Sequence, residues 1–184
     1  MKKRFLALAA CALALTACGA KTAQVQPAKL TEAEQELVAL VENSGRTKLF
    51  DVDLPEGTQW MDIAQATLVD GQWRQEMVMG GVPAGRLCLR VAGRGEVVYA
   101  SVGGATSRME GEPAGSLPEG SGYTETWLTA PVPLALDAET PVYLYIESAD
   151  GSVEALPPST YATPEKLAGY TRVTAITVRP TAQD

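Results

Sequence analysis

Four large aromatic residues have the types and spacing to bind a sugar ring. Tyr143 and Tyr145 are two positions apart in an alternating segment, so in a strand they share one face. Trp73 and Trp127, and also Tyr123, fall in other segments that could lie beside it. Exposed coplanar rings would make this set a carbohydrate-binding platform. Large rings are equally suited to filling the interior of a β-sheet protein, and we favour that interpretation.

A group of carboxylates suggests a second kind of chemistry. Asp51 and Asp53 share one strand face and are followed by Glu56 and Asp62, a possible oxygen-ligand set for Ca²⁺. The spacing lacks the alternate donors and turn glycine of a calcium loop, so we favour a solvated strand face and predict no metal. Asp51, Asp53 or Glu125 could instead serve a hydrolase, which needs two carboxyl groups about 5 to 10 Å apart in a cleft.

Sulfur-containing residues suggest a third kind of chemistry, the binding of copper. Met77 and Met79 alternate in one segment, Cys88 lies in another and Met61 in a third, which would be soft ligands for Cu(I) if they converged. Core packing is the more frequent role of such residues, and we favour it. Cys88 lies between two arginines, which would favour its thiolate, but it has no second cysteine with which to form a redox-active disulfide.

Composition excludes several functions. The chain of 184 residues has 0 histidines, which excludes Ser–His and Cys–His nucleophile pairs and histidine-ligated zinc or haem. Its 15 Lys+Arg against 22 Asp+Glu, a formal charge of -7, argue against a nucleic-acid partner. We therefore predict a protein that is not an enzyme and has no cofactor.

The N-terminus has the features of a lipoprotein signal peptide. Residues 2–4 are Lys, Lys and Arg, an apolar run follows from Phe5 to Leu15, and the run ends in Leu-Thr-Ala-Cys at 15–18. This motif is typical of a bacterial lipobox, in which Cys18 carries diacylglycerol and often a further acyl chain such as palmitate. We predict a signal peptide at 1–17, lipid attachment at Cys18, and location on the extracytoplasmic face of the cell membrane.

Cleavage before Cys18 would change both the net charge of the protein and the number of its free thiols. It removes three basic residues and no acidic one, which leaves a charge of about -10, so the protein surface would be repelled by anionic headgroups. Cys11 leaves with the signal peptide and Cys18 is alkylated. Cys88 would then be the only thiol, and no intramolecular disulfide could form.

Two segments precede the predicted domain. Residues 18–30 are small and polar after the lipidated cysteine, which predicts a flexible stalk. Residues 31–45 predict an amphipathic helix with a capping box from Thr31 to Glu34 and a stripe that includes Leu37, Val38 and Leu40. We favour a helix packed on its own domain; the alternative is a helix that docks a partner.

Residues 46–180 predict one β-sandwich domain. Apolar residues alternate with polar ones in many short segments, and Asp70-Gly71, Gly93-Arg94-Gly95 and Asp150-Gly151 suit hairpin turns. The predicted strands are 50–54, 60–69, 72–79, 87–91, 96–102, 123–128, 142–146 and 172–179. This pattern predicts an all-β antiparallel sandwich, Ig-like or jelly-roll-like, preceded by one helix.

The remaining segments predict connections. Residues 103–122 are rich in glycine and predict a long exposed loop. Between 156 and 169, a crossover should end in one helical turn with Thr163 as N-cap and Pro164 at its first position. Residues 181–184 predict a short tail.

With the lipobox, the capped helix and the strand series, the chain resembles small extracytoplasmic β-sandwich lipoproteins of Gram-positive bacteria. The stretches that carry the resemblance are Asp70-Gly71-Gln72-Trp73, Thr126-Trp127-Leu128 and the segment from Tyr170 to Val178. The resemblance implies a sandwich fold and an envelope location, and it implies no catalytic or binding residue.

We expect a lipid-anchored envelope protein that is not an enzyme and presents a recognition or assembly surface, with another envelope protein as its partner. The alternative is a carbohydrate-binding module that uses Trp73, Trp127, Tyr143 and Tyr145 to hold a glycan. That alternative requires the four rings to be exposed and coplanar.

Overall fold

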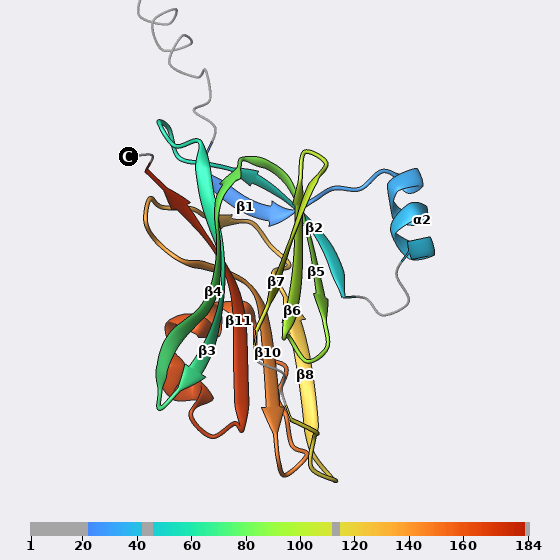
Figure 1. Ribbon diagram of the computed structural model, residues 1–184, viewed down its shortest axis with the longest axis vertical. Helices are drawn as coiled ribbons and strands as arrows, with labels where there is room; N and C mark the ends of the chain where they lie inside the picture. Colours follow the sequence, from blue (N-terminus) through green and yellow to red (C-terminus); the bar gives the residue numbers. More distant parts are fainter. Residues whose placement is uncertain (1–21, 42–45, 112–114, 183–184) are drawn as a thin grey trace, which may run out of the picture.

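The computed structural model describes residues 22–41, 46–111 and 115–182. Cys18 and the predicted signal peptide lie outside these residues. Within them, two antiparallel sheets pack face to face, which confirms the predicted β-sandwich (Figure 1). Sheet A has the strand order β7-β6-β5-β2-β1-β9, and sheet B has the order β4-β3-β11-β10-β8.

The elements have the following bounds. Sheet A contains β1 (Gln24–Pro27), β2 (Thr47–Asp53), β5 (Gly85–Ala92), β6 (Val97–Val102), β7 (Ala105–Glu110) and β9 (Val132–Pro133). Sheet B contains β3 (Trp60–Val69), β4 (Gln72–Pro83), β8 (Gly122–Trp127), β10 (Thr140–Ser148) and β11 (Arg172–Thr181). The helices are α2 (Glu32–Val41) and two short 3₁₀ helices, η1 (Pro158–Ala162) and η2 (Pro164–Leu167).

Turn chemistry fixes the hairpin registers. Asp70 and Gly71 have φ angles of 51° and 75°, the two positive values that a type I′ turn requires, and they join β3 to β4 as predicted. A single residue, Ala84, separates β4 of sheet B from β5 of sheet A. The chain therefore changes sheets at this point without a long connection.

The inner faces of the two sheets form the main core. Apolar side chains alternate along each strand and meet between the sheets; they include Phe50, Ile63, Leu87, Tyr143 and Val178, each at most 1% exposed. No disulfide links the described strands, so burial of these side chains is the main source of stability.

A second core lies on the outer face of sheet B. Leu144, Ile146, Val173 and Ala175 point away from sheet A and are covered by η1, η2 and their flanking residues, with Leu167 fully buried among them. Pro164 begins η2 as predicted. The Thr163 side chain does not cap η2; its hydroxyl donates instead to the Thr160 carbonyl at 3.2 Å.

Three strands were not predicted, and two of them correct a prediction. Residues 24–27 of the predicted stalk form β1, which pairs with β2 and β9. Residues 105–110 of the predicted exposed loop form β7, paired with β6, and β9 is the third. Each correction has the same physical reason. In β1 only Val25 is buried and in β7 only Met109 is, so the sequence shows no alternation to detect.

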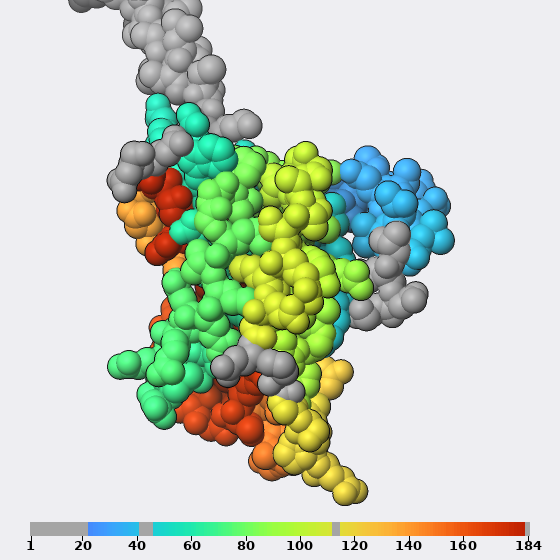
Figure 2. Space-filling model, viewed as in Figure 1, coloured from blue at the N-terminus to red at the C-terminus, as the bar shows by residue number. Residues whose placement is uncertain are grey.

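Helix α2 lies outside the sandwich. In the sequence it lies between β1 and β2, whereas the prediction placed it before all the strands. It forms a separate lobe in Figures 1 and 2. Leu37 is 61% exposed and Leu40 is 81% exposed. The favoured prediction that this stripe packs on its own domain was therefore wrong, because the two leucines turn away from the sheets.

Among the residues that the structure describes, no helix is both long enough and apolar enough to cross a bilayer.

Three phenols with raised pKa values, two of them fully buried and one partly buried, predict an alkaline transition. Burial raises the pKa of Tyr143, Tyr145 and Tyr161, and a nearby carboxylate adds to the rise in each case. A pKa raised by folding contributes stability that is complete below the unfolded pKa of about 10 and is lost as the pH rises above it. We expect the phenolate absorbance of these residues to appear together with the loss of near-UV circular dichroism. Phenolate forming at all tyrosines before any loss of that signal would contradict the prediction.

Candidate functional site

The four aromatic residues predicted to form a platform do not form one. Tyr143 and Tyr145 are 0% exposed on the inner face of sheet B. Trp127 packs beside them, with its ring centroid 4.6 Å from that of Tyr143. Trp73 belongs to the second core, where its ring stacks on Tyr161 at 4.3 Å and its Nε1 donates to the Tyr161 carbonyl at 2.9 Å. The rings lie on opposite faces of one sheet, and two of them are inaccessible.

Paired charges occupy one end of the interior. Arg46, which precedes β2, donates through Nε to Glu125 of β8 at 3.2 Å and through a second nitrogen to the same carboxylate. Arg94, in the turn between β5 and β6, lies 3.4 Å from Glu147 of β10. Each pair joins sheet A to sheet B. Glu125, one of the hydrolase candidates, is therefore part of an inter-sheet ion pair.

Asp51 of β2, another hydrolase candidate, belongs to an ion-pair network with Arg86 and Glu34. Asp51 accepts from Arg86 Nε at 3.0 Å, and Arg86 Nη1 donates to Glu34 of α2 at 2.7 Å. Within residues 22–41, 46–111 and 115–182, no three His, Cys, Asp or Glu side chains are placed to hold a metal ion. Asp51 thus links the sheet to α2 through arginine.

The sulfur-containing residues do not converge on one site. Met61 is fully buried in the main core, and Met77 and Met79 pack against the same core from β4. Cys88 is half-buried and alternates with the inward-facing Leu87 and Leu89, so it lies on the opposite face of sheet A.

A shallow groove lies between the edges of the two sheets. It has a volume of about 150 Å³ and is lined by residues 79–83 of β4 together with Ala100, Val102, Ala105 and Ser107. This volume is below the roughly 300 to 1,000 Å³ typical of small-molecule sites. None of the lining residues is titratable, so the groove offers no acid or base.

Helix α2 carries the most exposed apolar surface in the described chain. Its N-terminus has the predicted capping box: the Glu34 N–H donates to Thr31 Oγ1 at 3.3 Å, and the Thr31 N–H donates to the Glu34 carboxylate at 2.7 Å. Accepting that backbone hydrogen bond lowers the pKa of Glu34, and the Arg86 guanidinium adds to the effect. The cap and Arg86 together hold the helix on the sandwich at one end.

The two faces of α2 have different surroundings. Glu34 and Val38, one turn apart, are half-buried on the side toward the sandwich. Leu37 and Leu40 lie on the side that turns outward, and the helix has acidic residues in its first turn and no basic residue in its last. The stripe was identified from the sequence, but its exposure was not. The missing information was the contact of Arg86 with Glu34, which becomes apparent only when β5 is paired with β2.

Comparison with known proteins does not extend this description: no protein-family model, curated protein or solved structure matches the chain.

The Arg46–Glu125 pair predicts an asymmetric mutational effect. The two side chains are 21% and 15% exposed, so Arg46→Met leaves a largely buried carboxylate without its partner, at a cost of about 1 to 3 kcal/mol in the free energy of unfolding. Adding Glu125→Met should recover most of that loss, because both charges are then removed. Urea denaturation of both variants measures this. Equal stability of the single and double variants would contradict it.

The capping box predicts a local effect on α2. Thr31→Ala removes the Oγ1 acceptor and should lower the stability of the helix by about 1 kcal/mol. Since α2 lies outside both cores, the melting temperature of the sandwich should not change. Amide exchange within 32–40 reports the local loss, and Thr106→Ala on exposed β7 is the control. A fall in the melting temperature would show that α2 contributes to the sandwich.

Proposed function

We propose that this protein is a lipid-anchored envelope protein that is not an enzyme, and that α2 is its recognition surface. The observation that carries the proposal is the exposure of Leu37 and Leu40 on a helix that is capped and held in place at its N-terminus. A rigid helix with a solvated apolar stripe is the arrangement used when a helix docks into an apolar groove of a partner.

The sequence supports attachment by lipid. The lipobox ending at Cys18 would supply at least two acyl chains, which is enough for stable anchoring. The acidic composition gives the protein surface itself no attraction to anionic headgroups. In this proposal the protein resides on the extracytoplasmic face of the membrane and the acyl chains hold it there.

The charges on α2 define the chemistry of the partner. Glu32 and Glu36 are exposed beside the stripe, and the helix has no basic residue in its last turn. A groove that accepts Leu37 and Leu40 would therefore be apolar at its floor and basic at its rim. Another envelope protein with such a groove is the partner that this surface fits.

Site-specific photo-cross-linking in intact membranes tests the proposal. A photoreactive amino acid replaces Leu37 or Leu40, and the matched control replaces Ala39, which is exposed and lies about 160° around the helix axis from Leu37 and about 100° from Leu40. We expect one protein adduct from positions 37 and 40 and none from position 39. The double variant Leu37→Ser with Leu40→Ser should abolish co-purification of that protein.

Two outcomes would overturn the assignment of α2. Equal cross-linking from all three positions would indicate nonspecific exposure, and adducts with lipid alone would place the helix on the bilayer. The mass of the N-terminal peptide independently tests acylation of Cys18, because each acyl chain adds a defined mass.

A further inference from the structure

The short distance along the chain from Cys18 to the sandwich limits where the lipid can be. Ala23 already belongs to the fold, since its carbonyl accepts from the Leu134 N–H at 3.0 Å. Five residue steps separate Ala23 from Cys18, and five residues span at most about 18 Å in any conformation. By comparison, the 10 residues of β11 extend over about 33 Å. The bilayer must therefore lie near the end of the sandwich that contains Ala23.

Backbone contacts identify the segments at that end. Gln24 pairs with both Asp53 and Pro133, and Trp60 pairs with both Thr181 and Pro83. The anchor end therefore comprises the connections 54–59 and 134–139 and the corner at Ala84. Figure 1 shows the 54–59 connection, the entry into β1 and the C-terminal end of β11 on the same side of the molecule.

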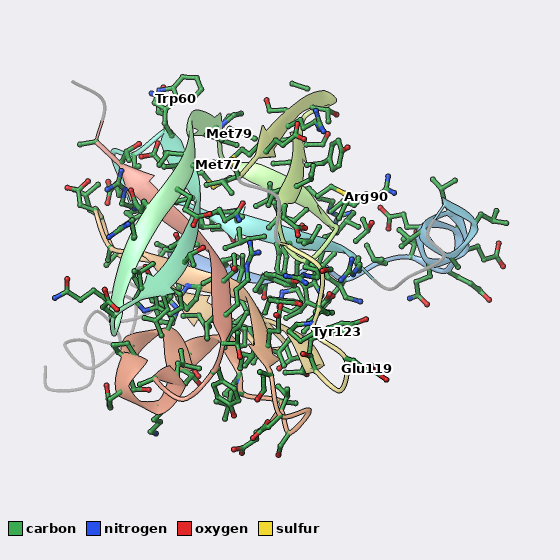
Figure 3. All side chains as sticks on the ribbon, turned by 60° about the horizontal axis from the view of Figure 1, so that its bottom comes forward. Trp60, Met77, Met79, Arg90, Glu119 and Tyr123 are labelled. Atoms are coloured by element: carbon green, nitrogen blue, oxygen red, sulfur yellow. The ribbon has the colours of Figure 1, made fainter. Side chains whose placement is uncertain are left out.

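The anchor end presents an exposed apolar side chain. Leu136 is 49% exposed and is one of five large apolar side chains with high exposure in the described residues. Its loop is held in place, because the Asp137 N–H donates to the Pro180 carbonyl at 2.9 Å and the Leu134 N–H to Ala23. Trp60, half-buried at the start of β3, lies at the edge of the molecule in Figure 3.

The charges at this end differ from those of a surface that binds anionic lipid. Connections 54–59 and 134–139 contain no lysine or arginine, and they contain three acidic residues, Glu56, Asp137 and Glu139. Attraction to anionic headgroups needs clustered basic residues, which these connections lack. An uncharged or zwitterionic lipid surface is therefore the partner that an exposed leucine fits here.

We propose that the anchor end rests on the lipid surface, with Leu136 inserted at the level of the headgroups and Trp60 beside it. This inference rests on the proposed lipidation of Cys18. The acyl chains supply the binding strength, and Leu136 limits the rotation of the domain about its tether. The long axis of the sandwich then points away from the bilayer, and α2 projects from its side toward neighbouring proteins.

Photo-cross-linking to lipid tests the contact. The acylated protein is reconstituted into phosphatidylcholine vesicles with a photoreactive amino acid in place of Leu136. The matched control replaces Val78 of β4, which is 47% exposed and pairs with Ala64, about 13 Å along β3 from Trp60. We expect lipid adducts from position 136 at a yield roughly tenfold above that from position 78, because only the first lies at the interface.

Vesicle composition provides a second measurement. Replacing part of the phosphatidylcholine with phosphatidylglycerol should lower the adduct yield at position 136 at low ionic strength, because Glu56 and Asp137 are repelled. Added salt should restore the yield, since it screens exposed charges. A yield that rises with the anionic lipid would overturn the assignment to a neutral lipid surface.

The outcomes separate this inference from the lipid anchor itself. Acylated Cys18 with equal adduct yields at positions 136 and 78 would overturn the contact and leave the anchor intact. An unmodified Cys18 in protein purified from membranes would overturn the anchor and, with it, the orientation. Acylation together with adducts confined to position 136 would support both.

Discussion

The contact between the inner faces of the two sheets is the constraint on which the rest of the structure depends. After the predicted cleavage, Cys88 would be the only thiol, so no disulfide could replace this burial. The inner layer therefore needs large side chains, and Tyr143 and Tyr145 supply them. Because these rings fill the interior, they cannot form a ligand platform. Paired arginines and glutamates then link the two sheets at one end of this layer.

The alternating segments predicted most of the fold, because each strand with several buried residues leaves a period of two in the sequence. The prediction of 60–69 coincides with β3, and Asp70-Gly71 forms the expected turn. The strands β1, β7 and β9 left no such pattern. They are stabilised by pairing with neighbouring strands, and pairing depends on backbone hydrogen bonds that sequence periodicity does not record.

The candidate site was predictable only in part, for a related reason. The spacing of Leu37 and Leu40 identifies an apolar helix face, but spacing is the same whether that face is covered or solvated. Arg86 determines that the face stays exposed, because it binds both Asp51 and Glu34 and so holds α2 by the side that carries Glu34. The position of Arg86 opposite Asp51 follows from the register of β5 on β2, which is a tertiary property.

The insertion of β1 between β2 and β9 connects the fold to the proposed location. If residues 18–30 were a flexible stalk, the sandwich could take any orientation on its anchor, and α2 could face in any direction. Because Ala23 already belongs to the fold, one end of the sandwich would lie within about 18 Å of a lipidated Cys18, and most of that freedom would be removed. In the proposed arrangement, a recognition helix on the side of such a domain would meet partners in the plane of the membrane, which would lower the entropy cost of docking. The short strand β1 thus fixes the geometry in which the exposed face of α2 is presented.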